Sequence, residues 1–329
     1  HSVNSLTLTA TCSVSGSGCT SASMSWGDGS SDSNISCSGS TVSHTYPSNN
    51  SYTYVATVNS SSGSNTYSRT VNFATGGGTN YALLNTCTIA NSVDISSNGS
   101  EIFALTSGGQ IRRYDTNCGD ETTMNVVSQP EGFGEAVSLS YCTGNNRITV
   151  ADRLRDKVYI YAVSGDDMTY SHAITTNLDA PDDVFCSNAN DIYVLDRGNR
   201  ALKKFNAVGT QQCLYNGWGT AGTDIAVDNA GNIYATDHAL NRVLKLTSGC
   251  AISTSISGLS NPRQLAVIPT GGELWVGDNG NNRIAIINPV DKSSLGIVAP
   301  SSAPLGMTII GGDLYSLSGG TTIESFGPQ

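Results

Sequence analysis

The feature that most constrains this chain is a ten-residue pattern that recurs about every 41 residues. "WVGDNGNNRI" spans 275–284 and "YATDHALNRV" spans 234–243, and each places an aspartate five positions before an arginine. Earlier copies, "TVADRLRDKV" and "YVLDRGNRAL", hold Asp152 and Asp196, so the four aspartates are separated by 44, 41 and 41 residues. A period of about 40 to 45 residues is typical of the four-stranded blades of a β-propeller.

The blades can be traced from short apolar strands in the later part of the chain. Their innermost strands are expected to begin near Val93, Val137, Val184, Ile225, Leu265 and Met307. These six starts predict a six-bladed propeller over residues 80–329. The sequence after Met307 supplies three strands only, so we expect "YALLNT" at 81–86 to be the fourth strand of the last blade and to close the ring.

The first 74 residues are of a different kind. Residues 1–74 contain few charged side chains and show period-two alternation in "SLTLTATCSV", "SYTYVATV" and "TYSRTVNF". This pattern predicts an antiparallel β-sandwich. The glycines of "TGGGT" at 75–79 mark a linker. The predicted fold class is therefore all-β, with an Ig-like sandwich followed by a propeller.

Two motifs in the first domain carry a family resemblance. "SWGDGS" at 25–30 and "HTYPSNNSYTYVATV" at 44–58 resemble the PKD family of Ig-like domains. We expect Trp26 and Tyr54 to be core aromatics and Gly27 to Gly29 to form a tight turn. The resemblance implies that this motif, with His44, is a signature of the fold rather than of catalysis.

The second domain resembles NHL-repeat propellers in blades two to five, with Thr106 and Ser318 replacing the aspartate in blades one and six. We interpret the acidic and basic residues as structural, because a carboxylate beside a turn can accept backbone N–H bonds and pair with a cation. A reactive pair is not needed four times. The residues of these turns are Asp152, Lys157, Asp196, Asp237, Arg242, Asp278 and Arg283.

Composition limits the partners and the compartment. The chain has 329 residues and a formal net charge of −10, with no basic cluster, which argues against nucleic-acid binding. It has no apolar run long enough for a membrane span. Nine cysteines without metal-binding spacing favour an oxidising, extracellular environment and a removed leader. We expect disulfides between Cys19 and Cys37 and between Cys186 and Cys213. Sequons for N-glycosylation occur at Asn34, Asn49, Asn59 and Asn98.

The chain offers few candidates for catalysis. Four histidines are too few and too scattered for a lyase-type metal site, and no nucleophile motif is present. Lactonase-like propellers hold a divalent cation at the channel mouth, and the residues counted just before the inner strands would form such a ring. This candidate ligand-binding ring is Asn91, Glu135, Asp183, Asp224 and Arg263, with Leu305 in the sixth blade. Arg263 opposes a cation, so we predict no catalytic residues, no bound metal and no cofactor, with the metal-dependent lactonase-like hydrolase as the alternative.

The predicted function is adhesion or assembly at the cell surface, with a glycan or protein ligand. Domains of the PKD type usually have a strand ahead of "SLTLTATCSV", and only four residues precede it here. An unpaired edge can accept a strand from another copy, so we expect self-association into a fibre through residues 3–14. The residues expected at this junction are Val3, Leu6, Leu8, Ala10, Cys12 and Val14.

Overall fold

The chain divides into two compact units, His1–Thr79 and Asn80–Gln329, which are described separately. The computed structural model describes residues 6–12, 19–26, 29–35, 40–46, 51–60, 63–72, 81–119, 122–218, 222–270 and 272–328. Strands dominate both units, and the helical turns among the described residues are two short 3₁₀ segments, His238–Leu240 and Asn279–Asn281. The all-β fold expected from the sequence is confirmed.

The first unit contains two antiparallel sheets. Their strands are β1 (Leu6–Cys12), β2 (Cys19–Ser25), β3 (Ser31–Ile35), β4 (Ser40–Tyr46), β5 (Ser51–Ser60) and β6 (Gly63–Asn72). One sheet is β1-β4 and the other is β3-β2-β5-β6. Trp26 is fully buried, and its indole Nε1 donates to Asp32 Oδ2 at 2.8 Å. The Gly27 and Asp28 positions of the predicted turn, and the side chains of His44 and Tyr54, lie outside the described residues.

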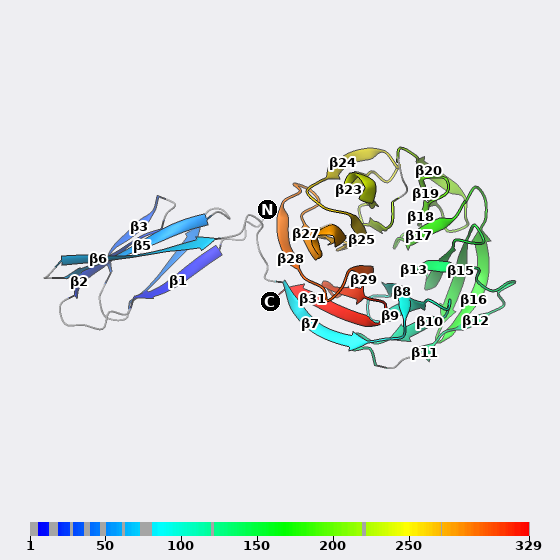
Figure 1. Cartoon of the computed structure of the whole chain (residues 1–329), viewed down its shortest axis with the longest axis horizontal. Coiled ribbons are helices and arrows are strands. Elements are labelled where there is room, and N and C mark those ends of the chain that lie inside the picture. The colour runs from blue at the N-terminus through cyan, green and yellow to red at the C-terminus, as the bar shows by residue number, and fades with distance from the viewer. Residues whose placement is uncertain are drawn as a thin grey trace. The chain divides into compact units, whose positions relative to one another are not determined.

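The described residues of the second unit form six sheets around a central channel, which we number as blades one to six (Figure 1). Blade one is β8 (Ser92–Ser97), β9 (Ile102–Thr106), β10 (Ile111–Tyr114) and β11 (Thr122–Thr123). Blade two is β13 (Ala136–Cys142), β14 (Arg147–Asp152), β15 (Lys157–Ser164) and β16 (Asp167–Ile174), with β12 (Asn125–Val127) added. Blade three is β17 (Pro181–Cys186), β18 (Ile192–Asp196), β19 (Ala201–Phe205) and β20 (Gln211–Tyr215).

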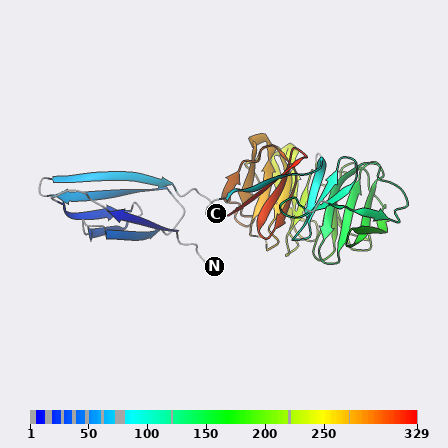
Figure 2. The same cartoon turned by 90° about the horizontal axis from the view of Figure 1, so that it is seen from below.

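The remaining blades repeat this order. Blade four is β21 (Ile225–Val227), β22 (Ile233–Asp237), β23 (Arg242–Leu246) and β24 (Ile252–Ile256). Blade five is β25 (Pro262–Val267), β26 (Leu274–Asp278), β27 (Arg283–Ile287) and β28 (Ser294–Val298). Blade six is β29 (Pro304–Ile310), β30 (Asp313–Ser318), β31 (Thr322–Pro328) and β7 (Tyr81–Thr88). Figure 2 shows the ring from its edge, with the strands running between its two faces.

The core of the propeller lies between neighbouring blades. Every residue of β22 is buried, because both faces of this strand are covered by adjacent sheets. One apolar cluster joins Tyr193 and Leu195 of blade three to Ile225 and Ile233 of blade four. Strands buried on both faces need apolar residues at consecutive positions, which explains runs such as that of β22.

The ring closes as the sequence predicts. Strand β7 pairs antiparallel with β31, from Tyr81 opposite Pro328 to Thr88 opposite Thr322. The Tyr81 ring packs edge-on against Trp275 of blade five at 4.8 Å between centroids, and its hydroxyl donates to Glu273. The closing strand is therefore bonded within blade six and packed against blade five.

Blade two has a fifth strand that the sequence analysis did not predict. Residues Asn125–Val127 of β12 pair in parallel with Asp167–Thr169 of β16. The β12 segment comes from the connection after blade one, so it extends the outer edge of blade two. It is three residues long and exposed, and such a segment gives no periodic signal in the sequence.

Three disulfides are present among the described residues, and each joins neighbouring blades. Cys87 of β7 bonds to Cys118 in blade one, Cys142 of β13 to Cys186 of β17, and Cys213 of β20 to Cys250 in blade four. The predicted pairing of Cys186 with Cys213 is wrong. Cys186 lies on the innermost strand of blade three and Cys213 on its outermost strand, so each has its partner in a different neighbouring blade. Cys37, expected to pair with Cys19, lies outside the described residues.

Candidate functional site

The central channel contains a cavity of about 470 Å³ that inner strands of all six blades line. Its wall includes Tyr141 and Phe185, and Asn188 and Asn229 lie in the turns that follow the inner strands of blades three and four. Asn188 Nδ2 donates to Asn229 Oδ1 at 3.1 Å, so these turns are linked to each other. Its wall combines apolar side chains with many polar and charged ones, and this cavity is the first candidate for a ligand site.

Three aspartates lie along the wall of the channel and bond to the next blade in each case. Asp94 Oδ2 accepts from the backbone N of Leu139 at 2.9 Å. Asp183 Oδ2 accepts from Ile225 N at 2.8 Å, and Asp224 Oδ2 accepts from Leu265 N at 2.6 Å. Each carboxylate thus ties the inner strand of its blade to that of the following blade.

Ser138 and Gly306 occupy the equivalent positions in blades two and six. Ser138 Oγ donates to Asp183 Oδ1 at 2.6 Å and accepts from Val184 N at 3.3 Å, so a hydroxyl performs the same link. A Cβ at Gly306 would lie 2.5 Å from Asp94 Oδ1. The absence of a side chain at Gly306 therefore lets the carboxylate of blade one approach blade six closely.

The three carboxylates share an environment that disfavours their charge. Desolvation, followed by repulsion from Asp183, raises the pKa of Asp94 to about 8. Desolvation also raises the pKa of Asp183 and, with repulsion from Asp183, raises the pKa of Asp224 well above its usual value. At neutral pH Asp94 is therefore largely protonated.

The sequence-predicted ring only partly coincides with this wall. Asp183 and Asp224 line the cavity, whereas Asn91, Glu135 and Arg263 do not. Asn91 Nδ2 donates to Ser107 Oγ at 3.1 Å, and Glu135 pairs with Arg153 at 2.7 Å. Within the described ranges, no group of three or more His, Cys, Asp or Glu side chains is arranged to hold a metal ion.

The size of the mismatch differs between blades. In blades one and two the counted residues, Asn91 and Glu135, precede the wall positions Asp94 and Ser138 by three residues. In blade three Asp183 was counted correctly, although its strand has a bulge like those of blades one and two. Asp94 could have been found as the residue directly before Ile95, which is the first buried aliphatic side chain of its inner strand.

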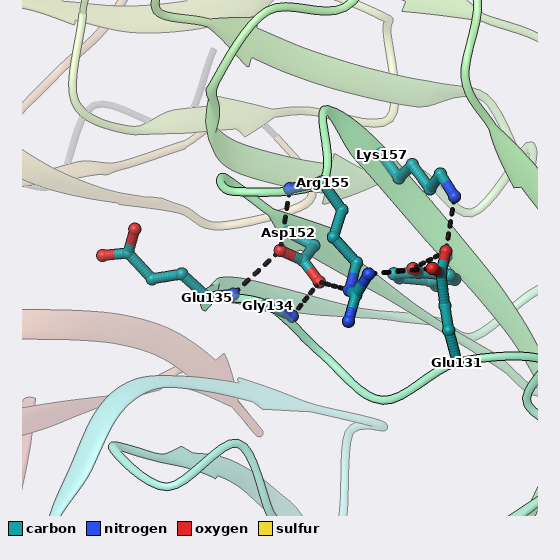
Figure 3. A network of polar contacts seen from close by, with 7 residues as sticks. Glu131, Gly134, Glu135, Asp152, Arg155 and Lys157 are labelled. Atoms are coloured by element: carbon teal, nitrogen blue, oxygen red, sulfur yellow. Dashed lines mark hydrogen bonds and ion pairs between the residues drawn. The ribbon is translucent and has the colours of Figure 1, made fainter.

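The repeated aspartates lie at the ends of the second strands, where their carboxylates are buried. Asp152 accepts from Gly134 N at 2.7 Å and Glu135 N at 2.9 Å, as Figure 3 shows. Lys157 pairs with Glu131 rather than with Asp152, and Arg155 also bonds Glu131 at 2.8 Å. Hydrogen bonds from Lys157 and Tyr159 hold the pKa of Glu131 below its usual range. This network fixes the connection that leads into blade two.

Blades four and five have the expected pairs within each turn. Asp237 Oδ2 accepts from Arg242 Nε at 2.9 Å, and Asp278 Oδ2 accepts from Arg283 Nε at 2.7 Å. Asp278 Oδ1 also accepts from Ser260 N at 2.6 Å, so the carboxylate joins the blade's first connection to its third strand.

In blades three and six, other residues bond the buried acid. Ala201 lies opposite Asp196, and the buried Lys203 two positions later supplies the cation at 2.5 Å. In blade six the acid moves to the third strand, where Glu324 accepts from Ser318 Oγ at 2.5 Å and from Ser301 N. Blade three thus keeps an acid–cation pair, whereas in blade six the acid bonds a hydroxyl and a backbone N–H.

The structure describes some of the residues that were expected to carry glycans or to form the fibre junction. Asn59 Nδ2 donates to Ser21 Oγ at 3.2 Å, and Asn98 Nδ2 donates to Glu101 Oε2 at 2.7 Å. Asn49 and the side chain of Asn34 lie outside the described residues, as do Val3 and Val14 of the expected junction. Leu6, Leu8, Ala10 and Cys12 belong to β1, which pairs with β4 alone among the described strands.

Comparison with known proteins supports the fold but assigns the chain to no particular family. No family model matches the sequence, and no curated protein matches it. The structure is similar to the crystal structure of the WD40 β-propeller domain of Doa1, with a TM-score of 0.54 and 11% sequence identity. That match covers 76% of this chain and 97% of the other, and at this identity it shows a β-propeller only. No helix in the described part of the chain has the length and apolar character to span a membrane.

Proposed function

We propose that the protein is an extracellular, non-enzymatic surface protein that acts in adhesion or assembly. The observation that carries this proposal is the bonding of the channel carboxylates, since each accepts a backbone N–H of the next blade. Groups that hold the ring together are poorly suited to move protons or to ligate a reactive metal. The three disulfides between blades support an oxidising location.

The proposed mode of assembly is strand donation to the first unit. Strand β1 pairs on one side with β4, and no described strand pairs with its other edge. An open edge offers unpaired N–H and C=O groups along its length. A strand from a second copy would bond to these groups, and a contact that joins head to tail without closing builds a fibre.

The finer family assignments belong to the same proposal. We infer a PKD-type sandwich from the buried Trp26 within the sequence "SWGDGS", and NHL-type blades from the Asp-Arg pairs of blades four and five.

Light scattering on the intact chain tests the assembly. The double variant Thr7→Lys, Thr9→Lys places charge on β1 without touching its alternate apolar positions, and we expect it to remain monomeric. The matched control, Thr66→Lys with Thr70→Lys, places the same charge on β6, the edge of the other sheet, and should assemble like the wild type. Equal behaviour of both variants contradicts a role for the β1 edge.

Metal analysis tests the alternative of a metal-dependent, lactonase-like hydrolase. We expect no stoichiometric divalent metal in the purified chain. A stoichiometric metal that is lost in Asp183→Asn and Asp224→Asn, together with lactone hydrolysis by the wild type, would instead establish the hydrolase.

A further inference from the structure

The channel cavity has a deep end and an open end. Its deep end is the level of Asp94, Asp183 and Asp224, at the starts of the inner strands. At the other end it is lined by exposed residues of the turns that follow the inner strands, among them Asn188 and Asn229. The cavity therefore opens to solvent on the face that carries these turns.

The open end is held by hydrogen bonds that run across neighbouring blades. Thr143 Oγ1 of blade two donates to Asn188 Oδ1, and Asn188 Nδ2 donates to Asn229 Oδ1 at 3.1 Å. The backbone N of Asn229 donates to the carbonyl of Pro269 in blade five at 2.8 Å. Asn229 Nδ2 itself donates to no residue that the structure describes, so both of its N–H groups are available to a ligand.

A second set of donors lies on the inner strands, between the two ends of the cavity. Ser96 Oγ accepts from Tyr141 N at 3.0 Å, and Ser140 Oγ accepts from Cys186 N at 2.9 Å. Both serines line the cavity, and Ser140 is only 5% exposed. Each hydroxyl can also donate one hydrogen bond, and no described residue accepts it. Because buried donors normally have acceptors, these hydroxyls leave places for acceptor oxygens inside the cavity.

The charges on the wall disfavour an anion. Five aspartates line the cavity against a single lysine, Lys204, so the wall carries an excess of acidic groups. Lys204 already pairs with Asp191 at 2.7 Å. An anionic ligand would therefore meet like charge without a free cation to pair with.

The deep carboxylates are also poorly suited to a cation. Every side-chain oxygen of Asp94, Asp183 and Asp224 already accepts a hydrogen bond from Ser138 or from a backbone N–H. Burial raises the pKa of Asp94 to about 8, which leaves this group largely uncharged at neutral pH. The cavity therefore suits an uncharged ligand.

The rest of the wall is apolar. The half-buried Phe185 lines the cavity, and its ring packs edge-on against Tyr193 at 6.4 Å between centroids. Ala226, Ala266 and Met307 line it from blades four, five and six. A ligand that fits this wall has both apolar C–H surface and hydroxyl groups, as a pyranose ring has. The volume of about 470 Å³ lies within the range of small-molecule sites, about 300–1,000 Å³.

We propose that the channel cavity binds a neutral sugar, either as the end of a polysaccharide or as a free monosaccharide. The Asn229 amide and the hydroxyls of Ser96 and Ser140 donate to the oxygens of the sugar. Phe185 and its apolar neighbours contact the C–H faces of the ring. The role of this binding in adhesion rests on the function proposed above, whereas the site itself lies within the propeller and does not require assembly.

NMR titration of the full chain with methyl glucoside, methyl galactoside and methyl mannoside tests this site, with glucuronate and glucosamine as charged probes. We expect at least one neutral glycoside to shift the side-chain amide signals of Asn188 and Asn229, and we expect both charged probes to bind more weakly. The proposal is overturned if no neutral glycoside shifts these signals, or if a charged probe binds more tightly than every neutral one.

The variant Asn229→Asp tests the predicted donor. It removes the free amide and keeps the oxygen that accepts from Asn188 Nδ2, so the turn retains its link to blade three. It should weaken glycoside binding about fivefold or more, as expected for the loss of a hydrogen bond.

The matched control is Asn206→Asp, in the turn between β19 and β20 on the same face but outside the cavity. Asn206 Oδ1 accepts from Thr210 N at 2.8 Å, and the aspartate keeps this oxygen too. This variant should bind the glycoside like the wild type. Equal affinities of the two variants contradict a contact at Asn229.

A trisaccharide of the sugar that binds best separates the two sources of this chemistry. A site for a polysaccharide end gains affinity from the additional sugars, whereas a site for the free monosaccharide gains none, and either result upholds the sugar site. A trisaccharide that binds Asn229→Asp as tightly as the wild type contradicts it. Failure of sugar binding in a chain that still assembles overturns this site alone, whereas sugar binding by a chain that stays monomeric overturns only the proposed assembly.

Discussion

Aspartates stabilise the propeller in two directions. Asp237 and Asp278 act within a blade, where each carboxylate joins the end of the second strand to the start of the third. Asp94, Asp183 and Asp224 act between blades, where each carboxylate reaches the backbone of the next inner strand. Aspartate side chains therefore join strands within a blade at some positions and join neighbouring blades at others.

Removal of a turn carboxylate should be costly. Asp278→Ala leaves Arg283 and the backbone N of Ser260 without their acceptor, so we expect a loss of roughly 2–4 kcal/mol in the free energy of unfolding. Asp291→Ala, in an exposed turn, should change it by less than about 1 kcal/mol. Urea denaturation of both variants measures the difference, and equal losses would contradict the structural role of Asp278.

The channel carboxylates predict that stability falls as pH rises. The pKa of Asp94 is about 8 in the folded chain and near 3.8 when unfolded, so its contribution is complete below pH 4 and is lost as pH rises toward 8. One such group changes the unfolding free energy by up to about 1.4 kcal/mol per pH unit. Asp94→Asn should flatten this dependence in denaturant titrations between pH 4 and 8. An unchanged slope in Asp94→Asn would refute the assignment.

At the residue scale, sequence periodicity indicates which positions recur but not their partners. The spacing of Asp278 and Arg283 was sufficient to predict a turn pair, because five residues span a tight connection. Lys203 was missed as the cation that pairs with Asp196. It lies two positions after Ala201, which is the residue opposite Asp196. Asp94 was missed because the residue taken to precede the inner strand of blade one was Asn91, three positions before it.

The strand that closes the ring is the element on which the others depend. β7 covers the outer edge of β31, and Tyr81 anchors it to Trp275 and Glu273 of blade five. Its place could be predicted because blade six otherwise lacks a fourth strand. The added strand β12 could not be predicted, since its pairing depends on the exposed edge of β16 rather than on its own three residues.

Deletion of residues 81–88 should expose the edge of β31 and cause aggregation instead of a stable shortened propeller. The control Leu83→Lys keeps the strand, and its side chain is 51% exposed, so it should stay soluble and fold normally. Size-exclusion chromatography and thermal melting compare the two. A monomeric deletion variant with a cooperative transition shows that β7 is dispensable.

The disulfide between blades two and three should contribute strongly to stability. Cys142 and Cys186 close a loop with a sequence separation of 44 residues, for which chain entropy gives about 4 kcal/mol. We expect the double variant Cys142→Ser, Cys186→Ser to lose most of this free energy in guanidinium denaturation. A loss below about 1 kcal/mol would mean that the hydrogen bonds of Ser138, rather than the disulfide, hold the two inner strands together.

At the scale of the whole molecule, the propeller is a closed ring whose hydrophobic cores lie between neighbouring blades. Because the ring is closed, each blade packs against a neighbour on both of its faces. The described strands of the first unit show no such closure, because the smaller of their two sheets consists of β1 and β4. The number of blades and the two-unit organisation follow from the repeat and the composition of the sequence. Disulfide partners do not, since they depend on how blades pack across the ring.

Electron microscopy of the native protein tests the central claim of assembly most directly. We predict fibres in which a strand from a neighbouring copy pairs along Leu6–Cys12, on the edge of β1 opposite β4. Each copy should display its propeller outside this junction. Single particles at all protein concentrations, with no added strand beside β1, would contradict the account.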